Sequence, residues 1–309
     1  TGTPIENSLA ELWSIFDFLM PQYLFNYHYF QKQYENDIIK NNDEEKTKQL
    51  KKLVTPFILR RNKKEVLTEL PDKIEQNIIL PFNDEEEKLY VANLAEVNKE
   101  LQELYDLEGS DKMQILKLLT RLRQLCLEPR LVYDNIDQPS SKLKACMELI
   151  KTMQENKQKV LLFSSFTSVL DLIAEECQKA GITYYMLTGS TNKEDRRELV
   201  SRFQKDDTTV FLISLKAGGT GLNLTSAEAV IHFDPWWNVS AQNQATDRAY
   251  RIGQKNNVQV FNLVMKDSVE EKIIELQKRK KELADMFVEN NSGGLSQMSK
   301  EDILSLFTM

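Results

Sequence analysis

Short apolar runs alternate with amphipathic helical patterns over the second half of the chain. The predicted strands are five runs rich in Val, Ile, Leu, Phe and Tyr, at residues 160–163, 184–187, 210–213, 229–233 and 258–264. The predicted helices before, between and after them cover residues 142–154, 169–179, 193–204, 241–250 and 269–288. Strands that alternate with helices in this way form a mostly parallel sheet with helices on both faces. The pattern therefore predicts an α/β fold for this half.

The first half of the chain is mainly helical by the same criterion. Residues 8–20 carry an apolar side chain every three or four positions and end at Pro21, which favours a helix. Residues 83–107 predict a long helix rich in Glu and Lys, and a second helix follows it. Residues 73–80 are typical of a short strand. A polar segment with a proline, Asp134–Ser141, is the best linker candidate between the two halves.

Composition indicates a globular protein without a metal or disulfide framework. The chain has 309 residues, of which 41% are hydrophobic and 28% charged, and no run is long enough for a membrane helix. The three cysteines and two histidines are scattered, so a reducing cytoplasm fits best and no zinc site is expected. The net charge of −7 argues mildly against nucleic acid as a partner, although local basic patches decide such binding.

A glycine-rich segment, Ser214–Leu224, follows one of the buried strands. In an open parallel sheet, ligands bind at the carboxyl ends of the strands, so this segment is a candidate binding loop. It combines three glycines with a hydroxyl and a cation: Gly218, Gly219, Gly221, Thr220 and Lys216. Glycines let the backbone approach a ligand closely. The spacing is not that of a Walker A loop, which is absent from the whole sequence.

Two further loops at the same edge are rich in hydroxyls. Ser165 lies in SSFTS after the first strand, and Thr188 begins TGST after the second. Hydroxyls beside a helix N-terminus can hold phosphate oxygens. Ordinary helix capping explains both loops about equally well.

Two adjacent tryptophans, Trp236 and Trp237, lie in the loop FDPWWN after the fourth strand. One of them is expected in the core. The other is a candidate for stacking on a base or sugar, or for a wedge against a nucleic-acid strand. Packing is the more common use of such a pair, so the residues alone favour it.

The string QATDRAYRIGQ, at 244–254, carries two arginines three residues apart. On a helix, Arg248 and Arg251 would share a face. Arginine stays charged and presents a rigid fork of donors, which suits a phosphate that gains charge during transfer. Taken alone, an exposed basic helix face is the better interpretation of two such arginines.

These motifs together resemble the Swi/Snf family of DNA-dependent ATPases over nearly the whole chain. The resemblance rests on an ordered set of strings: TGTPIEN, FILRRNKKEVLTELPDK, LRQLCLEPRLV, KVLLFSSFTSVLDLI, LTGSTNKEDRRELVSRFQ, SLKAGGTGLNLTSAEAVIHFDPWWN and QATDRAYRIGQ. It implies a superfamily-2 translocase on double-stranded DNA, in which two RecA-like lobes bind ATP between them. The closing MSKEDILSLF resembles the tails of bacterial members, which implies a bacterial source and a cytoplasmic, nucleoid-associated protein.

The resemblance also assigns roles to individual residues. Arg248 and Arg251 match the arginine fingers. The positions that match the neighbours tying this motif to the nucleotide, or the loop linking the ATP cleft to DNA, are Gln244, Asp247, Gly219, Gly221 and Asn223. The positions that match contacts to the tracked strand are Lys216, Thr220 and Trp237, with Ser165 and Thr188 as weaker phosphate contacts. Trp236 is expected in the core.

The resemblance implies four parts and a missing partner. They are the end of a first-lobe motif with a leading helix (1–20), a helical insertion (21–139), the second RecA-like lobe (140–266) and a brace helix with a tail (267–309). The chain is expected to be a piece of a longer protein whose first lobe holds the Walker A loop and Mg²⁺. Without that lobe the piece is not expected to hydrolyse ATP. Double-stranded DNA and a DNA-bound protein such as RNA polymerase are the other expected partners.

Two other functions compete with this interpretation. A non-enzymatic module that only binds DNA or protein is the main alternative, and the intact arginines and glycine-rich segment argue against it. A Rossmann-like enzyme is the second, and the absence of G-x-G-x-x-G after the first strand argues against it.

Overall fold

The computed structural model describes residues 9–41, 43–58, 70–106, 112–218 and 221–287. The described residues form two compact units. The smaller contains residues 9–58, with 237–240 and the last helix from Glu275, and the larger contains 70–236 and 241–274. The opening TGTPIEN, the basic residues Arg60 to Lys64 and the closing MSKEDILSLF lie outside the described residues.

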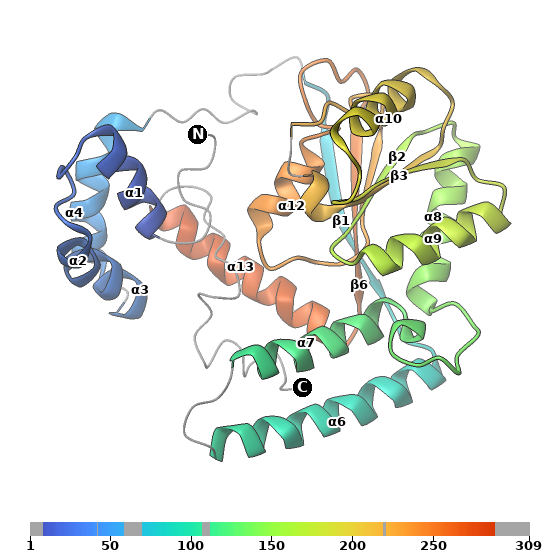
Figure 1. Ribbon diagram of the computed structural model, residues 1–309, viewed down its shortest axis with the longest axis horizontal. Helices are drawn as coiled ribbons and strands as arrows, with labels where there is room; N and C mark the ends of the chain where they lie inside the picture. Colours follow the sequence, from blue (N-terminus) through green and yellow to red (C-terminus); the bar gives the residue numbers. More distant parts are fainter. Residues whose placement is uncertain (1–8, 42, 59–69, 107–111, 219–220, 288–309) are drawn as a thin grey trace. The chain divides into compact units, whose positions relative to one another are not determined.

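The larger unit is built on a six-stranded parallel sheet in the order β1-β6-β5-β2-β4-β3 (Figure 1). The strands are β1 (Lys73–Leu80), β2 (Val160–Ser164), β3 (Tyr184–Leu187), β4 (Val210–Ser214), β5 (Ala229–His232) and β6 (Val258–Met265). The residues of β2, β4 and β5 are all buried, because helices cover both faces of the sheet. The predicted α/β class with a parallel sheet is confirmed.

Helices pack on both faces of this sheet. The helices of the larger unit are α6 (Asp84–Asp106), α7 (Lys112–Leu127), α8 (Ser141–Glu155), α9 (Thr167–Lys179), α10 (Lys193–Lys205), α11 (Leu215–Gly218) and α12 (Val239–Thr246), with the start of α13 (Val269–Phe287) and a short 3₁₀ turn (Pro129–Leu131). Side chains of α8 and α9 pack with Leu162 of β2 in one apolar cluster. Its neighbour Leu161 points to the opposite face, where it packs with α10 and α12.

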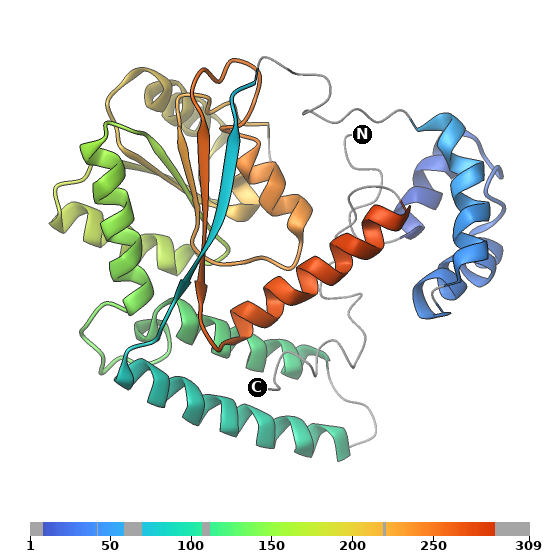
Figure 2. The ribbon, with the colours of Figure 1, turned by 180° about the vertical axis from the view of Figure 1, so that it is seen from behind.

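The first strand belongs to this sheet rather than to a separate helical insertion. All eight residues of β1 pair with β6, and the two strands lie side by side in Figure 2. The helical pair α6–α7 also packs against the larger unit, at the starts of α13 and α8. Tyr90 Oη accepts the amide of Val269 at 2.8 Å, and Glu86 accepts that of Ser141 at 2.7 Å. The break between compact units falls near residue 70, and the expected four-part division of the chain stays a prediction. Sequence patterns cannot reveal such long-range pairing.

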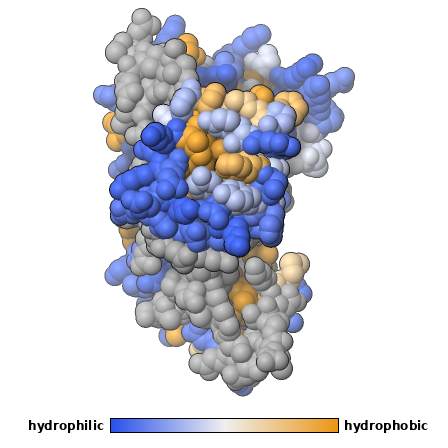
Figure 3. Space-filling view, turned by 90° about the vertical axis from the view of Figure 1, so that its left-hand side faces the viewer, coloured by the Kyte–Doolittle hydropathy of each residue, from blue (hydrophilic) through white to orange (hydrophobic). Residues whose placement is uncertain are grey.

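The smaller unit is helical around an apolar cluster of its own, which includes Leu12, Phe16 and Phe30. Its helices are α1 (Leu9–Leu19), α2 (Tyr27–Phe30), a π-helical turn (Gln31–Glu35), α3 (Asn36–Asn41), α4 (Glu44–Val54) and a 3₁₀ turn (Thr55–Phe57). Figure 3 shows apolar side chains gathered among hydrophilic ones on one face of the molecule. The large apolar side chains that this unit exposes are Phe18, Leu19, Phe25, Tyr27, Tyr29 and Phe57.

A fully buried ion pair joins the starts of α8 and α13. Lys142 Nζ lies 2.6 Å and 2.7 Å from the two carboxylate oxygens of Glu270, and neither side chain is more than 1% exposed. Glu270 also accepts the amide of Met265 at 2.8 Å, and Lys142 lies over the ring of Phe233. Two charges out of water need this complete set of contacts to offset their lost hydration.

Removing one member of this pair should destabilise the larger unit strongly. Lys142→Met leaves the Glu270 carboxylate buried without its cation, which costs about 3–5 kcal/mol. Urea denaturation at neutral pH measures the change. The double variant Lys142→Met/Glu270→Met should recover most of the loss, because apolar side chains of similar volume need no compensating charge. Equal stability of wild type and Lys142→Met would contradict the expectation.

Candidate functional site

The candidate residues gather at the carboxyl edge of the sheet. β2 has β4 on one side and β5 on the other, so the chain order reverses there. Ligands of open parallel sheets bind at such a point, outside the carboxyl ends of the strands. The loops after β2, β4 and β5 carry Ser165, the glycine-rich segment and the tryptophans.

The glycine-rich segment leaves β4 through a buried glycine. A Cβ added to Gly218 would lie 2.7 Å from Cε1 of Phe163, so a side chain does not fit without movement. Gly221 is exposed and has φ +27°, which also favours glycine. Gly219 and Thr220 lie outside the described residues. Lys216 and Asn223, on either side of them, are exposed.

Arg248 contacts this segment at two points. Its Nε donates to the carbonyl oxygen of Gly218 at 3.0 Å. Its own carbonyl accepts the amide of Leu224 at 3.0 Å. The glycine-rich segment is therefore tied at residues 218 and 224 to a single arginine of the QATDRAYRIGQ string.

The two arginines do not share a helical face, because α12 ends at Thr246. The prediction of a helix to Tyr250 is wrong, and residues 247–253 form successive turns. After Thr246 the amides of Arg248 and Ala249 bond to carbonyls three residues back, and Arg248 itself contacts Gly218 and Leu224. The last two contacts come from the tertiary structure, so the sequence pattern did not reveal them.

The arginines nevertheless lie close enough to interact. Burial lowers the pKa of Arg248, the positive charge of Arg251 lowers it further, and Asp247 partly offsets both. Arg248 is partly buried, whereas Arg251 is exposed. Gln244 is partly buried on the last turns of α12. The string thus presents one anchored and one exposed guanidinium.

The hydroxyl loops carry structural contacts of their own. Thr188 donates its amide to Thr191 Oγ1 at 3.0 Å, and its hydroxyl lies 2.8 Å from that of Ser190. Ser165 donates its hydroxyl to the carboxylate of Asp234 and accepts from Arg123 Nη2 at 2.9 Å. Local turn contacts account for the hydroxyl of Thr188, and long-range contacts to Asp234 and Arg123 account for that of Ser165, so their phosphate roles stay predictions.

A buried carboxylate that the sequence analysis did not single out organises this edge. Asp234 accepts hydrogen bonds from the hydroxyl of Ser164 at 2.7 Å and the amide of Ser165 at 3.0 Å. It also pairs with Arg123 of α7 at 2.7 Å. An acidic residue directly after a buried strand is a signal for Asp234. Nothing in the sequence links it to Arg123, which lies 111 residues away.

The two adjacent tryptophans are both at least partly buried. Trp236 packs against the apolar cluster on the α10 and α12 face and is partly exposed. Trp237 is only 6% exposed, so its ring is not displayed as a surface contact. The core position expected for Trp236 is confirmed in part, and the DNA contact of Trp237 stays a prediction.

Buried polar groups fix α12 to the sheet. His232 Nε2 lies 2.9 Å from Thr246 Oγ1, and Gln242 Nε2 donates to Asn262 Oδ1 at 2.9 Å. The ring of His232 stacks on that of Phe163, with centroids 5.6 Å apart. Burial lowers the pKa of His232 to about 4, so the imidazole is neutral at pH 7. The helix that leads to the arginines is thereby held by hydrogen bonds of a neutral histidine.

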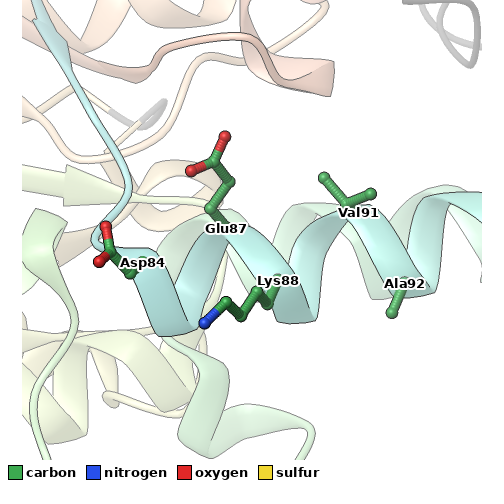
Figure 4. A pocket seen from close by; sticks show the side chains of 5 residues that line it. All are labelled: Asp84, Glu87, Lys88, Val91 and Ala92. Atoms are coloured by element: carbon green, nitrogen blue, oxygen red, sulfur yellow. The ribbon is translucent and has the colours of Figure 1, made fainter.

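A surface pocket lies apart from the carboxyl edge. Figure 4 shows a surface pocket whose described lining residues, Asp84, Glu87, Lys88, Val91 and Ala92, belong to α6. It shares no residue with the carboxyl edge. Across the described ranges, no three His, Cys, Asp or Glu side chains are grouped to hold a metal ion. None of the helices searched in those ranges has the length and apolar character that a membrane span requires.

Comparisons with known proteins agree with this architecture. Residues 1–131 match the SNF2-related domain, and residues 141–253 match the helicase conserved C-terminal domain. The chain belongs to the Swi/Snf family. It is 39% identical to an uncharacterized ATP-dependent helicase of Mycoplasma pneumoniae, over 99% of this chain and 29% of that protein. It is 37% identical to the putative ATP-dependent helicase/translocase YwqA of Bacillus subtilis, over 100% of this chain and 34% of that protein.

A solved structure of the family gives the same fold. The SWI2/SNF2 ATPase core of Sulfolobus solfataricus in complex with double-stranded DNA is 33% identical, with a TM-score of 0.63, and the match covers 99% of this chain and 65% of that one. This Swi/Snf chain spans about a third of the length of its curated bacterial relatives. The two domain matches are separated by residues 132–140, which contain most of the polar segment predicted as a linker.

The buried histidine predicts a pH dependence of stability. The pKa of His232 lies near 6.5 in the unfolded chain and about 4 in the folded one, so the unfolded state gains the proton first as the pH falls. Stability contributed by the neutral imidazole is full above about pH 6.5 and is lost toward about pH 4. Glu75 and Asp234 oppose the shift, whereas Lys73 adds to it.

We expect this histidine to account for a loss of about 1 kcal/mol between about pH 7.5 and about pH 5.5. Urea denaturation at the two pH values measures it. His232→Gln keeps a hydrogen-bonding group beside Thr246 but cannot take a proton in this range. The variant should therefore lose less stability than the wild type over the same interval, and equal losses would contradict the assignment.

Proposed function

We propose that this chain is the second lobe of an ATP-driven translocase on double-stranded DNA, with the helical elements before and after it. The observation that carries the proposal is the hydrogen bond from Arg248 to Gly218. It joins the arginine-bearing turn, which suits a nucleotide phosphate, to the glycine-rich segment, whose backbone can approach a ligand closely. A displacement of the arginine-bearing turn would therefore also displace the glycine-rich segment.

On the nucleotide side, the donors of this chain suit the phosphates of ATP. Arg251 is exposed, and Arg248 lies close enough for the charge of Arg251 to act on it. ATP supplies a phosphoryl group that gains negative charge during transfer, and the two arginines would stabilise that charge. Gln244, at the end of α12, and Asp247, in the turn that follows, would help to orient them.

Hydrolysis would need groups from a first lobe. Phosphoryl transfer requires a phosphate cradle and Mg²⁺ besides the arginine fingers. We assign Mg²⁺, its acidic ligands and the activation of water to that lobe, and we expect this chain alone to be inactive. The apolar side chains exposed on α1–α4 suit a packing surface for the same lobe.

On the DNA side, the exposed Lys216 and Asn223 bracket the segment with Gly219, Gly221 and Thr220. A cation and polar groups in a close-approaching loop suit the phosphate backbone, and phosphate contacts carry little sequence information. Ser165 and Thr188 are weaker candidates of the same kind, and Trp237 is the weakest because it is buried.

The moved object would be a protein–DNA complex in a bacterial cytoplasm, at the nucleoid. RNA polymerase or another DNA-bound protein is a candidate because a translocase exerts force on whatever blocks its track. Absence of ATP hydrolysis by the full-length protein would instead favour the non-enzymatic module that binds only DNA or protein.

The finger assignment can be tested on the full-length protein. Arg251→Ala should lower the ATP turnover number by about 10³-fold or more, because the transition-state charge loses its cation, while ATP binding persists. Steady-state hydrolysis and equilibrium nucleotide binding measure the two effects. Arg202→Ala is the matched control, since it removes an exposed arginine of α10 that pairs with Glu198. Wild-type turnover by Arg251→Ala would rule out the assignment.

The DNA assignment can be tested through its dependence on salt. Lys216→Gln should weaken binding of duplex DNA by a similar factor for every sequence and reduce the slope of log affinity against log salt by about 1. Fluorescence anisotropy of duplexes at several salt concentrations gives the slope. Lys144→Gln, which removes an exposed lysine from α8, is the control. An unchanged slope in Lys216→Gln would exclude a phosphate contact.

A further inference from the structure

Arg123 of α7 lies where two loops of the carboxyl edge meet. Its side chain is 5% exposed, and its Nη2 lies 2.7 Å from the carboxylate of Asp234, which is 1% exposed. The same nitrogen donates to Ser165 Oγ at 2.9 Å and to the carbonyl of Pro235 at 3.4 Å. One guanidinium nitrogen therefore contacts both the loop after β2 and the loop after β5.

An aromatic ring from each of the two loops also lies against the guanidinium of Arg123. Cζ of Arg123 lies 4.9 Å from the ring centroid of Phe166, in the loop after β2. It lies 5.2 Å from the ring centroid of Trp236, in the loop after β5. A planar guanidinium stacks on aromatic rings while its edge donates hydrogen bonds, which a lysine ammonium cannot do.

The helix that carries Arg123 is part of a helical hairpin. α6 and α7 lie side by side (Figures 1 and 2). The hairpin contacts the rest of the larger unit at Asp234, and also where Tyr90 and Glu86 accept amides of Val269 and Ser141. Among these contacts, Arg123 is the one that reaches the carboxyl edge.

We propose that Arg123 is a positioning residue for DNA engagement, through which the hairpin α6–α7 fixes the loops after β2 and β5. The inference rests on the proposed function, which names Ser165 of the first loop and Trp237 of the second as candidate DNA contacts. A displacement of the hairpin would shift both loops together, while the turn with Arg248 and Arg251 is held separately by Gly218 and Gln254. The loops proposed to couple DNA binding to hydrolysis and the turn proposed for hydrolysis itself are therefore held by different contacts.

Stability alone does not explain such an arrangement. A buried ion pair is often no more stabilising than apolar side chains of similar volume. What the pair adds is direction, since hydrogen bonds and stacking fix one geometry and apolar contacts do not. A variant that keeps stability but removes this geometry separates the two roles.

The test uses the double variant Arg123→Met/Asp234→Leu in the full-length protein, with Lys142→Met/Glu270→Met as the control. Both replace a buried ion pair of the larger unit by apolar side chains, but only the first pair contacts the two loops. Urea denaturation measures stability, and ATP hydrolysis is measured without DNA and over a range of duplex concentrations. The first variant should fold, keep its basal rate and lose roughly tenfold of its maximal DNA stimulation. The control should keep its stimulation.

A folded Arg123→Met/Asp234→Leu variant with wild-type DNA stimulation would overturn the inference. Arg123→Lys provides a second test if the double variant does not fold, because it keeps the charge and loses the planar fork. Its stimulation should fall while its basal rate persists, and unchanged stimulation would again overturn the inference. A wild-type protein that DNA does not stimulate would contradict the proposed function instead.

Discussion

The carboxylate of Asp234 is the group on which the arrangement of the carboxyl edge depends. A charge with almost no water contact must be met by protein donors, because its lost hydration is otherwise uncompensated. Those donors come from the end of β2, from the loop that follows it and from α7. Helix, strand and loop therefore share one relative position, and the loop after β5 is fixed with them.

The two arginines of QATDRAYRIGQ are chemically identical and structurally unlike. Arg248 is partly buried and holds Gly218 and Leu224, whereas Arg251 is exposed. The difference arises because α12 ends at Thr246 and the chain then turns repeatedly. A continuous helix would have presented both guanidiniums alike. The early helix end thus separates an anchor for the glycine-rich segment from a cation at the surface.

Local pattern was enough to predict most elements of the sheet, because buried parallel strands are uninterrupted apolar runs. β3, for example, has the bounds 184–187 that its sequence predicts. Pattern failed wherever a distant partner decides the outcome. The strand at 73–80 was predicted, but its eight-residue pairing with β6 was not. The turns after α12 are tied to Gly218 and Leu224 through Arg248, and Arg123 pairs with a carboxylate 111 residues away.

Two buried ion pairs in one unit place helices rather than add net stability. Arg123–Asp234 locates α7 against the carboxyl edge, and Lys142–Glu270 locates the start of α13 against α8. Apolar contacts would tolerate small sliding of these helices, because they are not directional. A carboxylate that needs several donors at once does not tolerate it. In a lobe whose proposed work is to move loops against DNA, fixed helices make that movement reproducible from one ATP to the next.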